Sequence, residues 1–410
     1  MFGLPEIEVS RRHERLLLKT TVDENGPGTI LRDFEAFLAF VEEGELPLTG
    51  THQLRRQVLA DLNARLAHPL QTGLTRPLQK SYPHVNGLYL LLRASGLTFV
   101  QGTDRKPLLA VDEVVRQVWD SLNPTERYCT LLETWLVRGH PEIIGERGRG
   151  WFRVPDTFHQ VQWFFQQIPQ KGLQIAGNKD AEDSLRYWPG LHNLALLELF
   201  GLVEVRHGPP EQGKGWSIET VERTSWGDAL LAALHAGFFG DMGNLLAVES
   251  EEKVRFGVLQ QALQPYFPDW QENLSVPEWT FREGAHVFKV SLGKMWRRIA
   301  IPARLTLDDL ASAILNAVRF DHDHLYEFSY RNRFGVKDKA LHPYSDEGPA
   351  ADEVAIGDVP LRVGQTMTFL FDFGDMWEFD VALEQVDPES KIQKPVVLEK
   401  HGTPPQQYRW

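Results

Sequence analysis

Two polar segments in the last quarter of the sequence carry residue types that could bind a metal. Residues 321–324 alternate Asp and His. Since residues two apart on an extended chain share a face, His322 and His324 could ligate one divalent cation. Asp372 and Glu378 would complete a mixed site suited to activating water. The alternative is structural: His324 and Asp372 form hydrogen bonds, and Asp372 holds turn amides.

Hydrophobic alternation predicts how those acids meet. Pairing Phe373 with Trp377 lets both apolar sets face one core and leaves residues 374–376 as a turn. Asp372 then lies opposite Glu378, and this like-charged pair needs a cation, a shared proton or water. The two alternating sets are Met367, Phe369, Phe371 and Phe373, then Trp377, Phe379, Val381 and Leu383.

Other side chains in the same region could recognise a ligand. Two tryptophans could form a platform for a base or peptide, or pack in the core. Two neighbouring arginines could bind phosphate or pair with acids of the predicted hairpin. The predicted recognition surface comprises Trp296, Arg297, Arg298, His324, Asp372, Asp375, Trp377 and Glu378.

The N-terminal part repeats one pattern that would position a second set of candidates. An apolar helix ends at Gly96 in the first copy and at Gly201 in the second. Each glycine predicts a left-handed cap, and the extended runs that follow predict a hairpin. Helix, cap and hairpin indicate two winged-helix-like modules. Their tips could contact nucleic-acid phosphates or be polar only because they are solvated: Arg105, Lys106, Arg206, His207 and Lys214.

These patterns predict an α+β multi-domain protein, mostly helical at first and ending in a compact α+β domain with an antiparallel sheet. We expect a winged-helix-like domain over residues 1–120 and a helical segment with the second module over 121–265. A linker over 266–283 and the α+β domain over 284–410 follow. In that last domain, Thr306 and Asp309 have capping-box spacing at the start of a helix.

Composition narrows the class of protein to which this chain can belong. The 410 residues have a net charge of −13, so nucleic acid could bind only at a local basic patch. We find no signal peptide and no apolar run long enough to span a membrane. Cys129 is the single cysteine, which excludes an internal disulfide and a multi-cysteine zinc site. A reducing cytoplasm, without membrane association, fits best.

Several motifs come in an order seen in one known group. They are residues 294–299 (KMWRRI), Pro302, the capped helix, residues 324–328 (HLYEF) and residues 371–378 (FDFGDMWE). Residues 284–410 thereby resemble the Ri-plasmid ORF-three-like family, also called TnpR-type passenger proteins of insertion elements. The resemblance implies a compact α+β domain of unestablished biochemistry that some elements encode beside a transposase. Many members have other residues at Phe320, Phe379, Gln406 and Gln407, which indicates a divergent branch.

We therefore expect a non-enzymatic recognition or regulatory protein that binds nucleic acid or a protein partner. The resemblance alone suggests an association with mobile elements. No cofactor is expected and no catalytic residue stands out. The alternative is a metal-dependent hydrolase or nuclease, with a divalent metal held by His322, His324, Asp372 and Glu378. The sequence leaves the ligand and the oligomeric state open.

Overall fold

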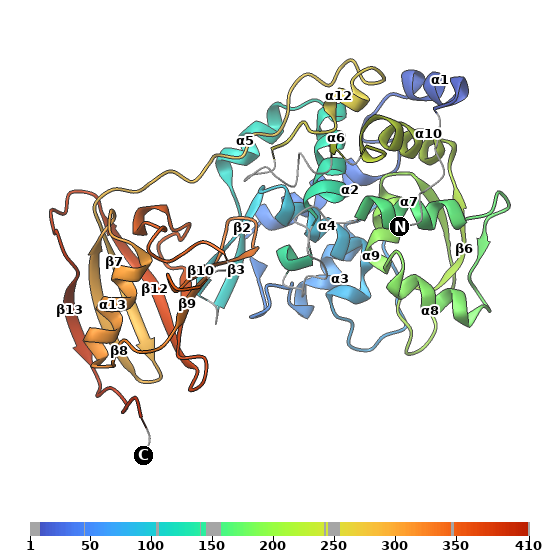
Figure 1. Cartoon of the computed structure of the whole chain (residues 1–410). Coiled ribbons are helices and arrows are strands. Elements are labelled where there is room, and N and C mark those ends of the chain that lie inside the picture. Colours follow the sequence, from blue (N-terminus) through green and yellow to red (C-terminus); the bar gives the residue numbers. More distant parts are fainter. Residues whose placement is uncertain are drawn as a thin grey trace. The chain divides into compact units, whose positions relative to one another are not determined.

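The computed structural model describes residues 9–44, 46–103, 106–139, 141–144, 157–241, 243–244, 255–345 and 348–408. The chain divides into two compact units, whose elements are labelled in Figure 1. The N-terminal unit comprises Met1–Phe99 and Leu109–Val276, and the C-terminal unit comprises Val100–Leu108 and Pro277–Trp410. Helices predominate in the first and antiparallel strands in the second, so the expected α+β class is confirmed. The boundaries at residues 120 and 265 stay a prediction.

One series of elements occurs twice in the first 223 residues, mostly within the N-terminal unit, although Val100–Leu108 of the first hairpin belong to the C-terminal unit. In each copy a helix, a short strand, two helices and a two-stranded hairpin follow one another. The three strands of each copy form a sheet in the orders β1-β3-β2 and β4-β6-β5. The first copy consists of α2 (Ile30–Glu42), β1 (Leu46–Pro47), α3 (Arg56–Ala64), α4 (Pro83–Ala94), β2 (Thr98–Thr103) and β3 (Lys106–Val111). The second consists of α7 (Thr157–Gln167), β4 (Leu173–Gln174), α8 (Lys179–Tyr187), α9 (Leu191–Leu199), β5 (Val203–His207) and β6 (Ile218–Arg223).

Further helices precede, interrupt or follow the two copies along the chain. After the hairpins, α6 and α10 each run on into a π-helical turn, which strengthens the likeness between the copies. The further helices are α1 (Arg11–Lys19), η1 (Gln79–Ser81), α5 (Glu113–Ser121), α6 (Pro124–Glu133), η2 (Thr134–Arg138), η3 (Pro141–Ile144), α10 (Ser225–Leu234), η4 (His235–Phe239) and α12 (Gln260–Leu263).

The predicted glycine caps are confirmed. Gly96 and Gly201 have φ angles of 79° and 72°, in the left-handed region that side chains with a Cβ rarely adopt. Gly201 is also sterically required, because a Cβ there would lie 2.6 Å from the main-chain nitrogen of Gly28. Each cap turns the chain from a buried helix into the hairpin that the sequence predicts.

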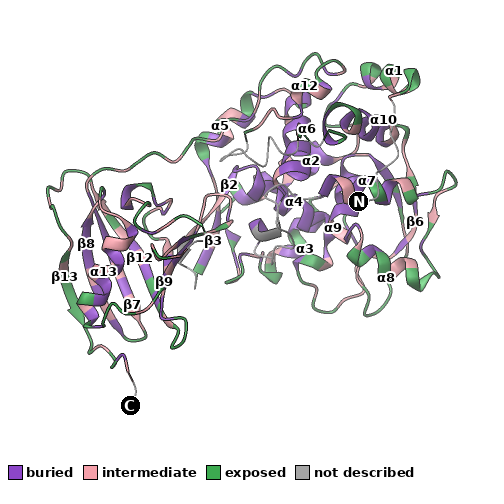
Figure 2. Cartoon of the chain, in the orientation of Figure 1, coloured by how far each residue is buried: buried purple, intermediate pink, exposed green. Residues whose placement is uncertain are grey.

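The last helices of the two copies pack against each other. All twelve residues of α4 are buried, and most of α9 is buried too (Figure 2). An apolar helix of this kind belongs in a core rather than on a surface. Gly87 lies at the crossing of the helices, where an added Cβ would come within 2.9 Å of the Leu196 Cγ. The crossing joins both copies into one core.

The C-terminal unit is built on a seven-stranded antiparallel sheet with the order β10-β9-β11-β12-β7-β8-β13. The helix α13 (Leu307–Val318) begins at the predicted capping box of Thr306 and Asp309, and its apolar residues join the core of the sheet. The other elements are β7 (Ala285–Leu292), β8 (Met295–Pro302), β9 (Tyr326–Arg331), β10 (Lys337–Leu341), η5 (Ile356–Asp358), β11 (Thr366–Phe371), β12 (Trp377–Asp387) and β13 (Val396–His401).

The predicted register of the β11–β12 hairpin is wrong. Phe371 pairs with Trp377, so Glu378 faces Leu370 and not Asp372. Asp372 has a φ of 57°, which ends β11 and begins a longer turn. Phe373 leaves the apolar alternation and is 49% exposed. Hydrophobic alternation alone could not predict this ending, because it treats Phe373 as a core residue.

Two predictions from composition can be compared with the described structure. Within the described residues, no helix has the length and apolar character needed to cross a membrane. Cys129 is buried in α6, as expected for a small core residue.

Candidate functional site

The two arginines of the predicted recognition surface make contacts within the domain. Arg297 is 4% exposed, and its guanidinium donates to the main-chain oxygens of Ala317, Trp296, His401 and Gly402. Arg298 forms ion pairs with Glu384, at 2.6 Å, and with Glu399, at 2.5 Å. These contacts tie β8 to β12 and β13, so they give both arginines a structural use.

The two predicted platform tryptophans lie in different surroundings. Trp296 stacks on His401 with 5.6 Å between ring centroids, and the Lys289 ammonium lies 5.0 Å from the Trp296 centroid. Trp377 packs edge-on against Phe320 at 5.1 Å. One ring therefore lies in a stacked arrangement beside cations, and the other contributes to the rim of the core.

Asp372 serves mainly to hold its own turn. Its Oδ1 accepts hydrogen bonds from the main-chain N–H groups of Gly374, at 2.8 Å, and Asp375, at 3.3 Å. The Nε2 of His324 lies 3.4 Å from the other carboxylate oxygen. This arrangement is the structural alternative that the sequence left open.

The four predicted metal ligands are not drawn together. His324 lies near Asp372 and Asp323, whereas His322 and Glu378 are exposed. Among the residues that the structure describes, the ligand atoms of these four side chains do not form a cluster with metal-like spacing.

The predicted nucleic-acid contacts have mixed surroundings. Arg105 lies outside the described residues, while Lys106 and Arg206 are exposed. Lys214 pairs with Glu211 at 2.7 Å. The loop around Lys214 is also anchored, because Gly213 and Lys214 exchange main-chain hydrogen bonds with Gly73 of the first copy. Part of the main chain at this hairpin tip is therefore already hydrogen-bonded to another segment of the protein.

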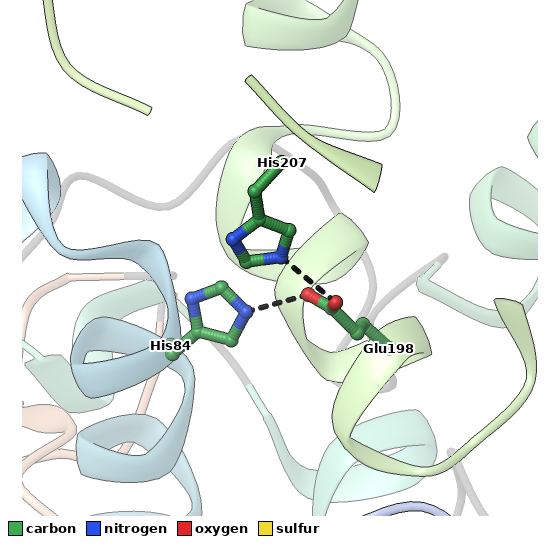
Figure 3. Close-up of side chains that lie close together, drawn as sticks. All are labelled: His84, Glu198 and His207. Carbon is green, nitrogen blue, oxygen red and sulfur yellow. Dashed lines mark hydrogen bonds and ion pairs between the residues drawn. The ribbon is translucent and has the colours of Figure 1, made fainter. Parts of the chain in front are cut away.

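His207 lies in a different cluster, shown in Figure 3. There the Nε2 of His84 is 2.7 Å from one oxygen of Glu198, and the Nε2 of His207 is 2.9 Å from the other. His84 lies at the start of α4, Glu198 near the end of α9, and His207 at the end of β5. The three side chains, which we call the junction triad, therefore connect the two copies. Within the described residues this is the group of three whose ligand atoms all lie within 4.8 Å of one another.

The junction triad is partly shielded from water, and His207 is its most exposed member, at 29%. The His84 side chain is 5% exposed and that of Glu198 20%. Trp216 packs against both histidine rings, with centroid distances of 4.8 Å to His84 and 5.5 Å to His207. Burial would raise the pKa of Glu198, but the hydrogen bonds from His207 and His84 outweigh it and lower that pKa to about 2. Glu198 is thus strongly held as a carboxylate.

A small cleft reaches this group. It is lined by Thr29, Asp33, Leu66, His68, His84, Glu198 and Leu199. The donor set of two imidazoles and one carboxylate is one that zinc takes in proteins. The junction triad is therefore the described cluster that could hold a metal.

Sequence reasoning missed His84 and Glu198, and assigned His207 to a hairpin tip. A weak signal was present: Glu198 is the single charged residue in the apolar run 194–200. A carboxylate at such a position needs a buried partner. The partner itself could not be read from the sequence, since His84 is 114 residues away.

These observations define an α+β protein with a duplicated helical unit and a separate antiparallel-sheet domain. Residues 286–408 match the family described as "Plasmid pRiA4b ORF-3-like protein", so the predicted resemblance is confirmed for the C-terminal part. The uncharacterized protein y4hQ of Sinorhizobium fredii (strain NBRC 101917 / NGR234) is 30% identical over 109 residues, 26% of this chain. The chain covers 54% of that protein's length.

One solved structure is also similar in sequence. It is the crystal structure of a protein of unknown function from Methanosarcina mazei Go1, with 24% identity and a TM-score of 0.28. The match covers 31% of this chain and 74% of that one. None of these descriptions names an activity.

Proposed function

We propose that this chain is a non-enzymatic recognition protein that binds a protein partner through its C-terminal domain. The contact would be made by an exposed apolar patch, the turn-end patch, consisting of Leu325, Phe373 and Met376. The plasmid reading frame in the family description supports an association with mobile elements as part of the same proposal.

The turn-end patch is the observation that carries the proposal. Leu325, Phe373 and Met376 are 45%, 49% and 56% exposed. They are neighbours, because the Asp372 N–H donates to the Leu325 carbonyl and Met376 donates back to the Asp372 carbonyl. Large apolar side chains exposed on neighbouring stretches of main chain favour a protein-binding surface.

We also propose that the two copies in the N-terminal unit are winged-helix modules. Their element order supports this, as does the position of the first strand beside the second strand of the hairpin. In a DNA-binding module of this kind the helix before the hairpin enters the major groove. Here those helices, α4 and α9, are buried against each other, which favours a scaffold over a DNA reader.

The test compares matched apolar-to-acidic variants. We expect F373D/M376D to lose a partner retained by the wild-type chain, because a charge in the patch must be desolvated on binding. L78D is the control, since Leu78 is also an exposed apolar residue, at 65%, and lies in the other unit. Equal retention by both variants would contradict the proposal.

Nucleic-acid binding is the competing outcome of the same experiment. DNA retention that falls with rising salt and is lost in R206E would replace the protein partner with nucleic acid. We expect no such retention, because the chain carries a net charge of −13.

The alternative class is a metal-dependent hydrolase built on His322, His324, Asp372 and Glu378. It is less well supported, because those ligand atoms do not converge among the described residues. Manganese-dependent hydrolysis of a phosphodiester, lost in H324A, would favour the hydrolase over the recognition protein.

A further inference from the structure

We propose that the junction triad is a divalent-cation site, with Zn²⁺ as its preferred ion, that fastens α4 to α9 and β5. The inference does not depend on the turn-end patch or on the proposed function of the C-terminal domain. It assigns a ligand to the part of the molecule where the two copies meet.

The donor atoms carry the argument. Two imidazole nitrogens and one carboxylate already face one another, with Nε2–oxygen distances of 2.7 Å and 2.9 Å. All ligand atoms lie within 4.8 Å of one another. Zn²⁺ holds such ligands at about 2.0–2.2 Å, which places them roughly 3.3 Å apart in a tetrahedron. Side-chain movements on the order of an ångström convert the hydrogen-bonded triad into a coordination shell.

The orientation of the rings supports a common ligand. Both histidines direct Nε2 toward the same carboxylate, as Figure 3 shows. The other ring nitrogen of His84, Nδ1, is buried without a hydrogen-bond partner in the described structure. Nε2 is therefore the nitrogen of His84 that faces the carboxylate, and it is the atom that would coordinate the metal.

The surroundings suit a structural ion. Trp216 packs against both imidazoles and limits their movement. The cleft lined by Thr29, Asp33, Leu66 and His68 leads to His84 and Glu198, so a water could reach the fourth coordination position. Imidazole and carboxylate ligands suit Zn²⁺ better than the oxygen-preferring Mg²⁺ or Ca²⁺.

A cation here would act on stability. The three ligands come from three elements that meet only in the folded chain, so the ion would bind the folded state alone. Such a ligand raises the melting temperature as its concentration increases. The expected function is a clamp across the α4–α9 crossing.

The test uses the full chain after treatment with a chelator. Equilibrium dialysis with ZnCl₂ and metal analysis should find one Zn²⁺ per chain, and the melting temperature should rise with zinc. We expect H207A and E198Q to weaken binding by at least about tenfold, because each removes a ligand. H324A is the matched control and should bind like wild type.

Three results would overturn the proposal. They are the absence of bound zinc and of a melting shift in wild type, undiminished binding in both H207A and E198Q, or loss of binding in H324A. If the triad variants fail to fold, the wild-type dialysis and melting data decide alone. F373D/M376D should bind zinc normally, so failure of this site and failure of the proposed partner surface are distinguishable.

Discussion

Two histidine–carboxylate groups among the residues that the structure describes differ in their surroundings. In the N-terminal unit, the His84 side chain is 5% exposed and its Nε2 is 2.7 Å from Glu198. In the C-terminal unit, the His324 side chain is 37% exposed and its Nε2 is 3.4 Å from Asp372. Asp372, at 11%, is less exposed than Glu198, at 20%, so the two pairs differ in the exposure of the histidine and in their separation. Because water reaches the His324 ring and the separation is longer, the second pair is screened more and contributes less to stability. The comparison teaches that location, more than residue type, determines which group matters for stability.

The largest effect should come from removing the shared acid of the buried group. We expect E198A to lower the free energy of unfolding by about 2–4 kcal/mol, because both histidines lose a buried charged partner. Urea denaturation measures this decrease in the free energy of unfolding. E378A, at an exposed acid of the other unit, is the control and should change stability by less than about 0.5 kcal/mol. Equal losses in the free energy of unfolding for E198A and E378A would contradict the greater weight given to the buried group.

The pH dependence of the same group sharpens this test. The pKa of Glu198 is lowered to about 2 in the folded chain, from an ordinary value of 4.5. Its stabilisation is therefore complete above pH 4.5 and is lost as the pH falls toward 2. The stability difference between wild type and E198Q should shrink across that window. A difference that stays constant from pH 5 to pH 2 would contradict the assignment.

A somewhat smaller effect is expected at the helix crossing that positions the group. G87V should destabilise the chain by about 2 kcal/mol, since the added atoms have no space beside Leu196. Thermal and urea unfolding measure it. G44V is the matched control, because nothing lies within 4 Å of a Cβ at Gly44. If G87V is as stable as G44V, the close crossing of α4 and α9 is not required.

A buried histidine of the C-terminal unit, His286, should also make stability depend on pH. His286 is fully buried, and neither ring nitrogen has a hydrogen-bond partner in the described structure. Burial, with a smaller effect of Arg282, lowers its pKa to about 4. As the pH falls from 6.5 to 4, His286 binds a proton in the unfolded chain but not in the folded chain, so the free energy of unfolding decreases.

Replacing His286 tests this pH dependence. Wild type should lose about 1–2 kcal/mol more than H286L between pH 7 and pH 5, because leucine does not titrate. The two proteins are compared by how their free energies of unfolding change with pH, because the effect of the substitution on packing does not depend on pH and cancels. Parallel pH profiles for the two proteins would contradict the prediction.

The smallest effect should come from the exposed histidine. H324A should cost less than about 1 kcal/mol, since a screened pair at 3.4 Å contributes little. Differential scanning calorimetry of the full chain measures it. A loss as large as that of E198A would mean that the exposed group is as strongly coupled as the buried one.

Much of the fold could be predicted because local rules suffice for it. Gly96 and Gly201 end their helices in the predicted conformation, and Thr306 caps α13. The turn after β11 could not be predicted in the same way. Its ending depends on Asp372 adopting a positive φ and capping its own turn, which outweighs the burial of Phe373.

The candidate site was harder to predict, because it depends on contacts between distant segments. His207 was selected for its place near a hairpin tip, yet its partner is Glu198 of α9. Nothing in the sequence around His84 indicates that α4 will cross α9 at Gly87. Only the packing of the two copies brings these side chains together.

The most direct test is a pair of double-mutant cycles, measured with a chelator present so that metal does not contribute. One cycle combines H84A with E198Q, and the other combines H324A with D372N. The account predicts a coupling energy above about 1 kcal/mol for the first pair and below about 0.5 kcal/mol for the second. Equal coupling energies, or a larger value for His324 and Asp372, would contradict it.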